Sequence, residues 1–153
     1  CSNSCAAWNN RILDDVGGFP TVLTNEDTFT VAQILARGHK IAYAADSIVK
    51  HSHRYNLVQE FKRYFDTGYA RAKIRRKEFS AVGDTGHGRK FFSAMFARLV
   101  REHPSLLPYA LLQTAVKYAG YRAGRIAIYL PSWIVRRFSA QDFYWTSVHF
   151  VEN

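Results

Sequence analysis

Two pairs of residues in the first third of the chain have the side chains that group-transfer chemistry needs. Glu26 and Asp27 are adjacent carboxylates at the start of an expected helix. His51 and His53 are separated by one serine and lie at the end of an expected strand, with His51 24 residues after Asp27. A carboxylate can act as a general base and an imidazole can bind a divalent cation, so the two pairs predict base-assisted or metal-assisted transfer.

Each pair also has an ordinary structural explanation. Two acids in the first turn of a helix complement the helix dipole, and taken alone this is the stronger explanation for Asp27. Two histidines at a spacing of two on extended chain point to one face, but they are too few for a metal site, so other ligands must come from elsewhere. Taken alone, His51 and His53 favour a surface or core role over metal binding.

The elements that must position these residues are a mixture of helix and strand. A short helix is expected over 10–16, ended by the pair Gly17-Gly18, which could also let backbone approach a substrate. A second helix is expected from a cap at Thr24 or Asn25 to residues 37–38. Short strands are expected over 40–43 and 47–50.

After His53 the pattern becomes helical and strongly basic. Apolar residues recur every three or four positions from Tyr55 to Lys77, and the other side of this helix carries seven cations between Lys62 and Lys77. No uncharged run reaches the roughly 20 residues that a membrane-spanning helix needs. A flexible loop is expected over 83–88, and further helices over 91–101, 105–129 and 133–138.

Composition limits the class of protein and the kind of partner. The 153 residues are 48% hydrophobic, which is enough for a folded domain with a core, and the formal net charge is +9. Cations beside aromatic residues suit an anionic membrane surface better than nucleic acid, for which no motif is present. Cys1 and Cys5 are expected to be buried free thiols. The chain starts without Met or signal-peptide features and is expected to be the C-terminal piece of a longer protein.

Five short segments, in this order, resemble the C-terminal half of family-2 inverting glycosyltransferases of the GT-A fold. The stretches 51–69 and 130–145 look like the rhamnosyltransferase subgroup of bacterial surface-polysaccharide assembly. The resemblance implies an α/β fold, with residues 1–53 as the acceptor-side part of the catalytic domain and 54–153 as a basic, amphipathic helical extension. The five segments are 2–8, 16–20, 25–28, 37–43 and 49–53.

The same resemblance implies a role for each candidate residue. Asp27 matches the catalytic base that takes the proton from an acceptor sugar hydroxyl, and Glu26 is its partner. His51 matches a histidine at the metal–diphosphate site, and His53 is a second candidate for this position. The implied substrate-binding positions on the acceptor side are Asn3, Gly17, Gly18 and Phe19.

The implied donor is a nucleotide-activated sugar such as dTDP-rhamnose, and the implied acceptor is a glycan or a lipid-linked glycan. The implied cofactor is a divalent cation, Mg²⁺ or Mn²⁺, whose main ligands belong to an Asp-X-Asp motif in an N-terminal half. No Asp-X-Asp occurs in these 153 residues, so the chain alone is expected to be inactive. The expected location is cytoplasmic, at the inner face of the bacterial cytoplasmic membrane. The alternative is a non-catalytic membrane-surface binding module in which Asp27 and His51 are structural.

Overall fold

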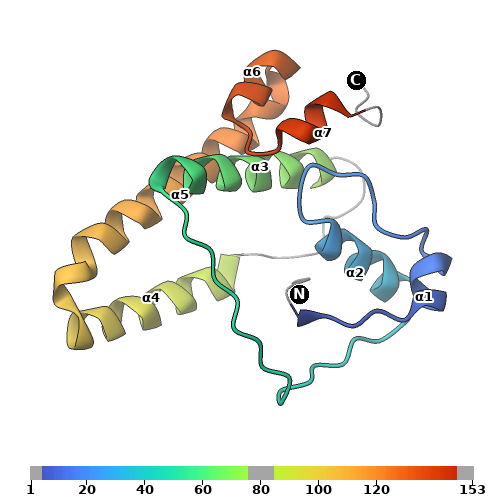
Figure 1. Cartoon of the computed structure of the whole chain (residues 1–153), viewed down its shortest axis with the longest axis horizontal. Helices are drawn as coiled ribbons and strands as arrows, with labels where there is room; N and C mark the ends of the chain where they lie inside the picture. Colours follow the sequence, from blue (N-terminus) through green and yellow to red (C-terminus); the bar gives the residue numbers. More distant parts are fainter. Residues whose placement is uncertain (1–4, 76–84, 148–153) are drawn as a thin grey trace. The chain divides into compact units, whose positions relative to one another are not determined.

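Two compact units make up the computed structural model, which describes residues 5–75 and 85–147, with side chains over 5–73 and 92–147. Unit 1 is Cys1–Arg54 together with Gln141–Asn153, and unit 2 is Tyr55–Ala140. The expected boundary after residue 53 lies one residue before this division, whereas the end of the expected extension groups with unit 1. Over the described residues both units consist of helices and irregular chain (Figure 1).

The first helix of unit 1 is α1 (Asn10–Asp15), as the sequence predicts. It begins at Asn9, whose side-chain oxygen accepts hydrogen bonds from the N–H groups of Arg11 and Ile12 at 3.0 and 3.3 Å. It ends at Gly17 and Gly18, which have φ values of 86° and 78°. Their N–H groups return to the carbonyls of Asp14 and Leu13 at 3.0 and 2.8 Å, which is the Schellman arrangement. The helix-stop interpretation of the two glycines is confirmed.

The second helix, α2 (Glu26–Ala36), ends in the same way. Gly38 has a φ of 81°, and the N–H groups of Gly38 and His39 donate to Leu35 and Ile34 carbonyls at 3.0 and 3.2 Å. Its start differs from the expected side-chain cap. Asn25 takes a left-handed conformation with a φ of 67°, and its side chain makes no capping hydrogen bond. The Asn25 carbonyl instead accepts from the backbone N–H groups of Thr28 and Phe29.

The core of unit 1 is small. Val16, Leu23 and Ile34 are each no more than 7% exposed, and Thr30 is completely buried. The short helix α7 (Asp142–Thr146), which the sequence pattern did not reveal as a helix, contributes the buried Trp145. Cys5 lies outside any helical apolar face and is exposed, so the prediction of a buried thiol is wrong there; Cys1 lies outside the described residues.

The chain between α2 and the next helix carries neither of the two expected strands. Residues 39–56 form irregular, mostly exposed chain, drawn as a long trace in Figure 1. A strand needs a neighbour with which to exchange backbone hydrogen bonds, and the described residues supply none here. The strand predictions over 40–43 and 47–50 are therefore wrong for this structure, while the α/β GT-A fold stays a prediction.

Unit 2 begins with α3 (Leu57–Arg75), which agrees with the predicted basic amphipathic helix. A capping box starts it: the N–H of Gln59 donates to the Asn56 side chain at 2.9 Å, and the N–H of Asn56 donates to the Gln59 side chain at 3.0 Å. The apolar spacing predicted the buried face at Phe65 and Tyr69, which are 3% and 7% exposed, but not at Val58, which is 65% exposed.

The rest of unit 2 is a run of helices. In Figure 1, α4 and α5 form a hairpin that turns at η2. The expected loop over 83–88 is wrong over residues 85–88, which are the first turn of α4, and residues 83–84 lie outside the described residues. The backbone hydrogen bonds of a continued helix outweigh the cost of about 1 kcal/mol for each helical glycine. The elements are α4 (Thr85–Glu102), η2 (Pro104–Leu106), α5 (Leu107–Ile126), η3 (Ala127–Tyr129) and α6 (Ser132–Phe138).

Three glycines let α3 and α5 pack with their backbones close together. A Cβ atom on Gly120 would lie 2.5 Å from the carbonyl oxygen of Phe61. A Cβ on Gly124 would overlap the carbonyl of Phe65, and one on Gly68 would overlap that of Tyr121. Gly120 and Gly124 are one helical turn apart on the same face, so the interface between these helices depends on the absence of side chains there.

Two polar groups are buried in unit 2. Glu60 is 8% exposed, and its Oε1 accepts from Gln113 at 3.1 Å and pairs with Lys117 at 3.3 Å, which joins α3 to α5. Asp66 is 1% exposed, and its Oδ2 accepts from the N–H of Ala140 at 2.8 Å. Burial raises the pKa of Asp66 to about 6, although hydrogen bonds from Ser139 and Ala140 and the charge of Lys62 act in the opposite direction.

Candidate functional site

The acidic pair lies in the first turn of α2, as expected. Asp27 is partly exposed, and its Oδ1 accepts from the backbone N–H of Thr28 at 2.7 Å and from the Thr28 hydroxyl at 3.3 Å. Glu26 is also partly exposed, and its carbonyl accepts from the buried Thr30 hydroxyl at 2.9 Å. The helix dipole favours negative charge at this end. The result is a carboxylate of fixed orientation that solvent, or a substrate hydroxyl, can reach.

The histidine pair lies on exposed, irregular chain rather than at a strand end. The His51 and His53 rings meet edge to face, with 4.4 Å between their centroids and 87° between their planes. The sequence therefore predicted correctly that the two rings share a face. Over residues 5–75 and 85–147, no group of three His, Cys, Asp or Glu side chains is placed to hold a metal ion. The acidic and histidine pairs do not form a complete metal site among the described residues.

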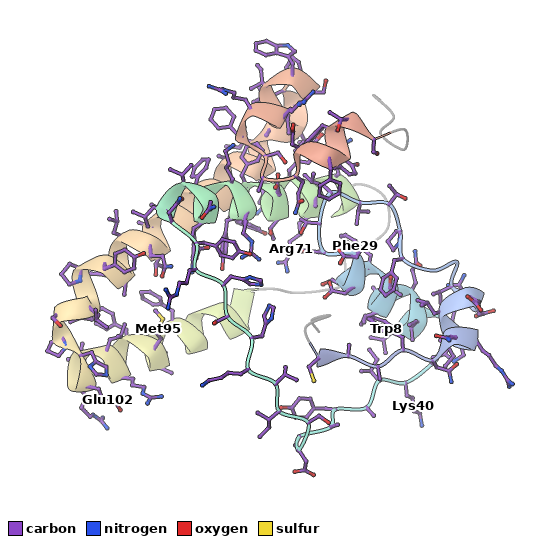
Figure 2. All side chains as sticks on the ribbon, in the orientation of Figure 1. Trp8, Phe29, Lys40, Arg71, Met95 and Glu102 are labelled. Atoms are coloured by element: carbon purple, nitrogen blue, oxygen red, sulfur yellow. The ribbon has the colours of Figure 1, made fainter. Side chains whose placement is uncertain are left out.

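The turn after α1 brings two aromatic rings together. Trp8, labelled in Figure 2, packs edge to face with Phe19, with 5.1 Å between ring centroids. Phe19 is still 41% exposed, so part of its ring is open to a ligand. Gly17 and Gly18 have their conformations set by the end of α1, and their predicted role in substrate binding stays a prediction. Asn3, the remaining predicted acceptor-side residue, lies outside the described residues.

An ion-pair cluster that the sequence did not reveal ties α1 to the end of α2. Asp15 Oδ2 lies 3.7 Å from Arg37 and 3.8 Å from His39 Nε2. All three side chains are more than a third exposed, so the pairs add little to stability.

Comparison with known proteins places the chain beside two bacterial rhamnosyltransferases. The O-antigen chain rhamnosyltransferase RfbN of Salmonella typhimurium is 37% identical over 153 residues, a match that covers 97% of this chain and 48% of RfbN. The O-antigen chain rhamnosyltransferase WbaN of Salmonella anatum is 39% identical with the same coverage. The chain thus spans about half the length of the curated relatives it matches. No protein-family model and no solved structure matches it.

Sequence reasoning missed several residues with structural or chemical interest in unit 2. Asp66 lies among the basic residues of α3, yet it is buried. The signal that could have found the close helix contact is the spacing of Gly120 and Gly124, four residues apart in a long helix. That contact brings the start of α3 against α5. Beside it is a groove that is lined by Lys62 of α3 and Arg137 of α6, among other residues.

Proposed function

We propose that this chain is the acceptor-side half of an inverting family-2 glycosyltransferase of the GT-A fold that transfers rhamnose from a nucleotide-sugar donor in O-antigen synthesis. The acceptor would be a glycan or a lipid-linked glycan. The observation that carries the proposal is the identity of 37% and 39% to two proteins named rhamnosyltransferases, along 97% of the chain. Such extended identity includes the helical unit 2 as well as the candidate site in unit 1.

Asp27 is the proposed general base. The acceptor hydroxyl oxygen attacks the anomeric carbon, the bond from that carbon to the donor diphosphate breaks on the opposite face, and the hydroxyl proton passes to the Asp27 carboxylate. The hydrogen bonds from Thr28 support this role because they orient the carboxylate before substrate arrives. Glu26, beside it, adds negative charge at the same end of α2.

The proposed cofactor is Mg²⁺ or Mn²⁺, which when bound offsets charge on the leaving diphosphate. His51 and His53 are adjacent and exposed, so either could contribute a nitrogen ligand. Two nitrogens do not complete a coordination shell, and no third ligand joins them among the described residues. The remaining ligands are therefore proposed to come from outside those residues.

Unit 2 is proposed to dock the protein on the inner face of the bacterial cytoplasmic membrane. Of the helices in the described ranges, none is both long and apolar enough to cross a bilayer. The alternative function, a non-catalytic membrane-surface module, shares this docking but lacks the chemistry at Asp27. The two functions are therefore separated by the transfer reaction and not by membrane binding.

The test is sugar transfer by the full-length protein with a panel of nucleotide sugars and a lipid-linked acceptor, with and without Mg²⁺ or Mn²⁺. Asp27→Asn is expected to lower kcat by a factor of roughly 10² to 10⁴, the usual contribution of a general base, and to leave donor affinity nearly unchanged. Asp46→Asn is the matched control, since Asp46 is an exposed carboxylate of the same unit. Transfer by Asp27→Asn at the control rate would place the base elsewhere, and no transfer of any sugar would favour the membrane module.

A further inference from the structure

A groove on unit 2 combines apolar walls with two cations. It lies among α3, α5 and α6 and has a volume of about 550 Å³. Lys62 and Arg137 are its charged residues, and none of the residues that line it is acidic. The two buried acids of α3 have partners that do not line the groove: Glu60 has Gln113 and Lys117, and Asp66 has the N–H of Ala140. The apolar lining consists of Leu57, Val58, Phe61, Val116 and Phe138.

The groove continues into exposed apolar surface on two sides. Leu112 lies one helical turn before Val116 and is 50% exposed, and Trp133 lies one turn before Arg137 and is 73% exposed. Figure 2 shows the side chains of α6 projecting away from the helix. Many large exposed apolar side chains beside an apolar groove favour an interaction surface. The others along α5, η3 and the start of α6 are Leu111, Tyr118, Ile126, Tyr129 and Leu130.

Charge decides which partner this surface suits. Besides the two cations of the groove, Arg122 and Arg125 on α5 and Arg136 on α6 are exposed among the apolar residues. A second copy of the chain would bring the same cations against one another, which costs free energy. A small soluble anion would gain nothing from the five apolar side chains. An anionic amphiphile satisfies both halves of the groove, because its phosphate meets the cations and its chain meets the apolar walls.

We propose that the groove binds one anionic phospholipid of the bilayer, with an acyl chain along Phe61, Val116 and Phe138 and the phosphate between Lys62 and Arg137. The exposed apolar side chains of α5 and α6 then rest at headgroup depth around this lipid. The inference rests on the membrane part of the proposed function and deepens it, since it names the residues that contact lipid. It does not depend on the transfer chemistry at Asp27.

The direct test uses the full-length protein and mixed vesicles of phosphatidylcholine and phosphatidylglycerol, with a photoreactive group on the acyl chain of one lipid or, in a separate experiment, of the other. Cross-links are expected in α3, α5 and α6 at the groove residues, only with the anionic lipid. Lys62→Gln with Arg137→Gln is expected to weaken vesicle binding about 25-fold, from about fivefold for each cation. Arg98→Gln with Arg101→Gln, on exposed positions of α4, removes the same charge and is the matched control.

Three results would overturn the proposal. Cross-links spread outside the groove, or equal losses in both double variants, would mean that only overall charge attracts the protein to vesicles. Loss of cross-linking when millimolar inorganic phosphate is present before irradiation would make the groove a site for a soluble anion. Dimers in solution that Val58→Asn dissociates would make it an interface between copies. Donor hydrolysis measured without vesicles reports separately on the proposed transferase, and it is expected to be the same in Lys62→Gln/Arg137→Gln as in the unaltered protein.

Discussion

The close contact of α3 with α5 predicts that Gly120→Ala destabilises unit 2, although alanine is the better helix former. The added Cβ would lie 2.5 Å from the carbonyl oxygen of Phe61. Cβ atoms essentially never approach a non-bonded atom closer than 3.0 Å, so the helices must separate by about 0.5 Å. The obstacle is backbone on both sides, which no side-chain rotation removes. Separation therefore loosens the packing of the buried rings Phe65 and Tyr69.

The size of this effect follows from dispersion energies. A gap of 0.5 Å forfeits about a quarter of each contact's attraction, which for two buried rings with roughly 50 contacts each amounts to about 3 kcal/mol. The higher helix propensity of alanine offsets about 1 kcal/mol of this loss in stability. The net loss is about 2 kcal/mol, within the usual range for overpacked interfaces. Gly124→Ala is expected to cost more, because its Cβ would come even closer to the carbonyl of Phe65.

Amide hydrogen exchange on the full-length protein measures this loss within unit 2 alone. Peptides from α3 and α5 are expected to exchange about 30-fold faster in Gly120→Ala, which corresponds to about 2 kcal/mol. Ala119→Met, an enlargement at the exposed neighbouring position, is the control and is expected to change exchange by less than about threefold. Slower exchange in Gly120→Ala, as helix propensity alone predicts, would refute the close-contact argument.

Two further predictions concern the buried acids of unit 2. Because the pKa of Asp66 is raised to about 6 from 3.8, the folded state binds more protons between these values, and stability is expected to fall by up to about 3 kcal/mol as pH rises from 4 to 6. Asp66→Asn keeps an acceptor for Ala140 and should abolish this slope in denaturation curves measured across the range; an identical slope in both proteins would assign it to another group. Glu60→Ala removes the partner of Gln113 and Lys117 and is expected to cost about 2 kcal/mol by denaturation, and Glu60→Gln less, because its amide oxygen still accepts. Equal losses in the two variants would mean that the hydrogen bonds contribute nothing.

Local signals in the sequence predicted most helices of this structure. The Gly17-Gly18 stop, the basic amphipathic helix after Tyr55 and the proline-led start of α5 each depend on neighbours within a turn or two. The strands over 40–43 and 47–50 failed because strand formation depends on a partner that the sequence of the segment does not encode. The loop prediction was wrong over 85–88 because it was based on glycine content alone, whereas α4 begins at Thr85 and continues through these glycines.

In the candidate site, too, the sequence predicted the features that depend on residues close together in the chain. The position of Asp27 in the first turn of α2 follows from sequence, and so does the common face of His51 and His53. The left-handed conformation of Asn25 was not predicted, because the sequence pattern offered this residue as a side-chain cap. The groove could not be predicted from the sequence because its residues come from three helices. Lys62 and Arg137, for example, are 75 positions apart in the chain. The register of α3 on α5, together with the packing of α6 against α3, brings them together.

That register links the stability of unit 2 to its proposed lipid site. Phe61 takes part in both features: its carbonyl faces Gly120, and its ring lines the groove opposite Val116, which lies one turn before Gly120. Displacement of α5 by Gly120→Ala must therefore widen the groove as well as loosen the helix pair, so faster exchange and weaker lipid binding are expected together. Lys62→Gln/Arg137→Gln changes the cations and leaves the helix contact intact, so lipid binding should fall while exchange in α3 and α5 stays the same. Weak lipid binding with unchanged amide exchange thus identifies lost phosphate contacts. Weak lipid binding with faster amide exchange identifies a displaced α5.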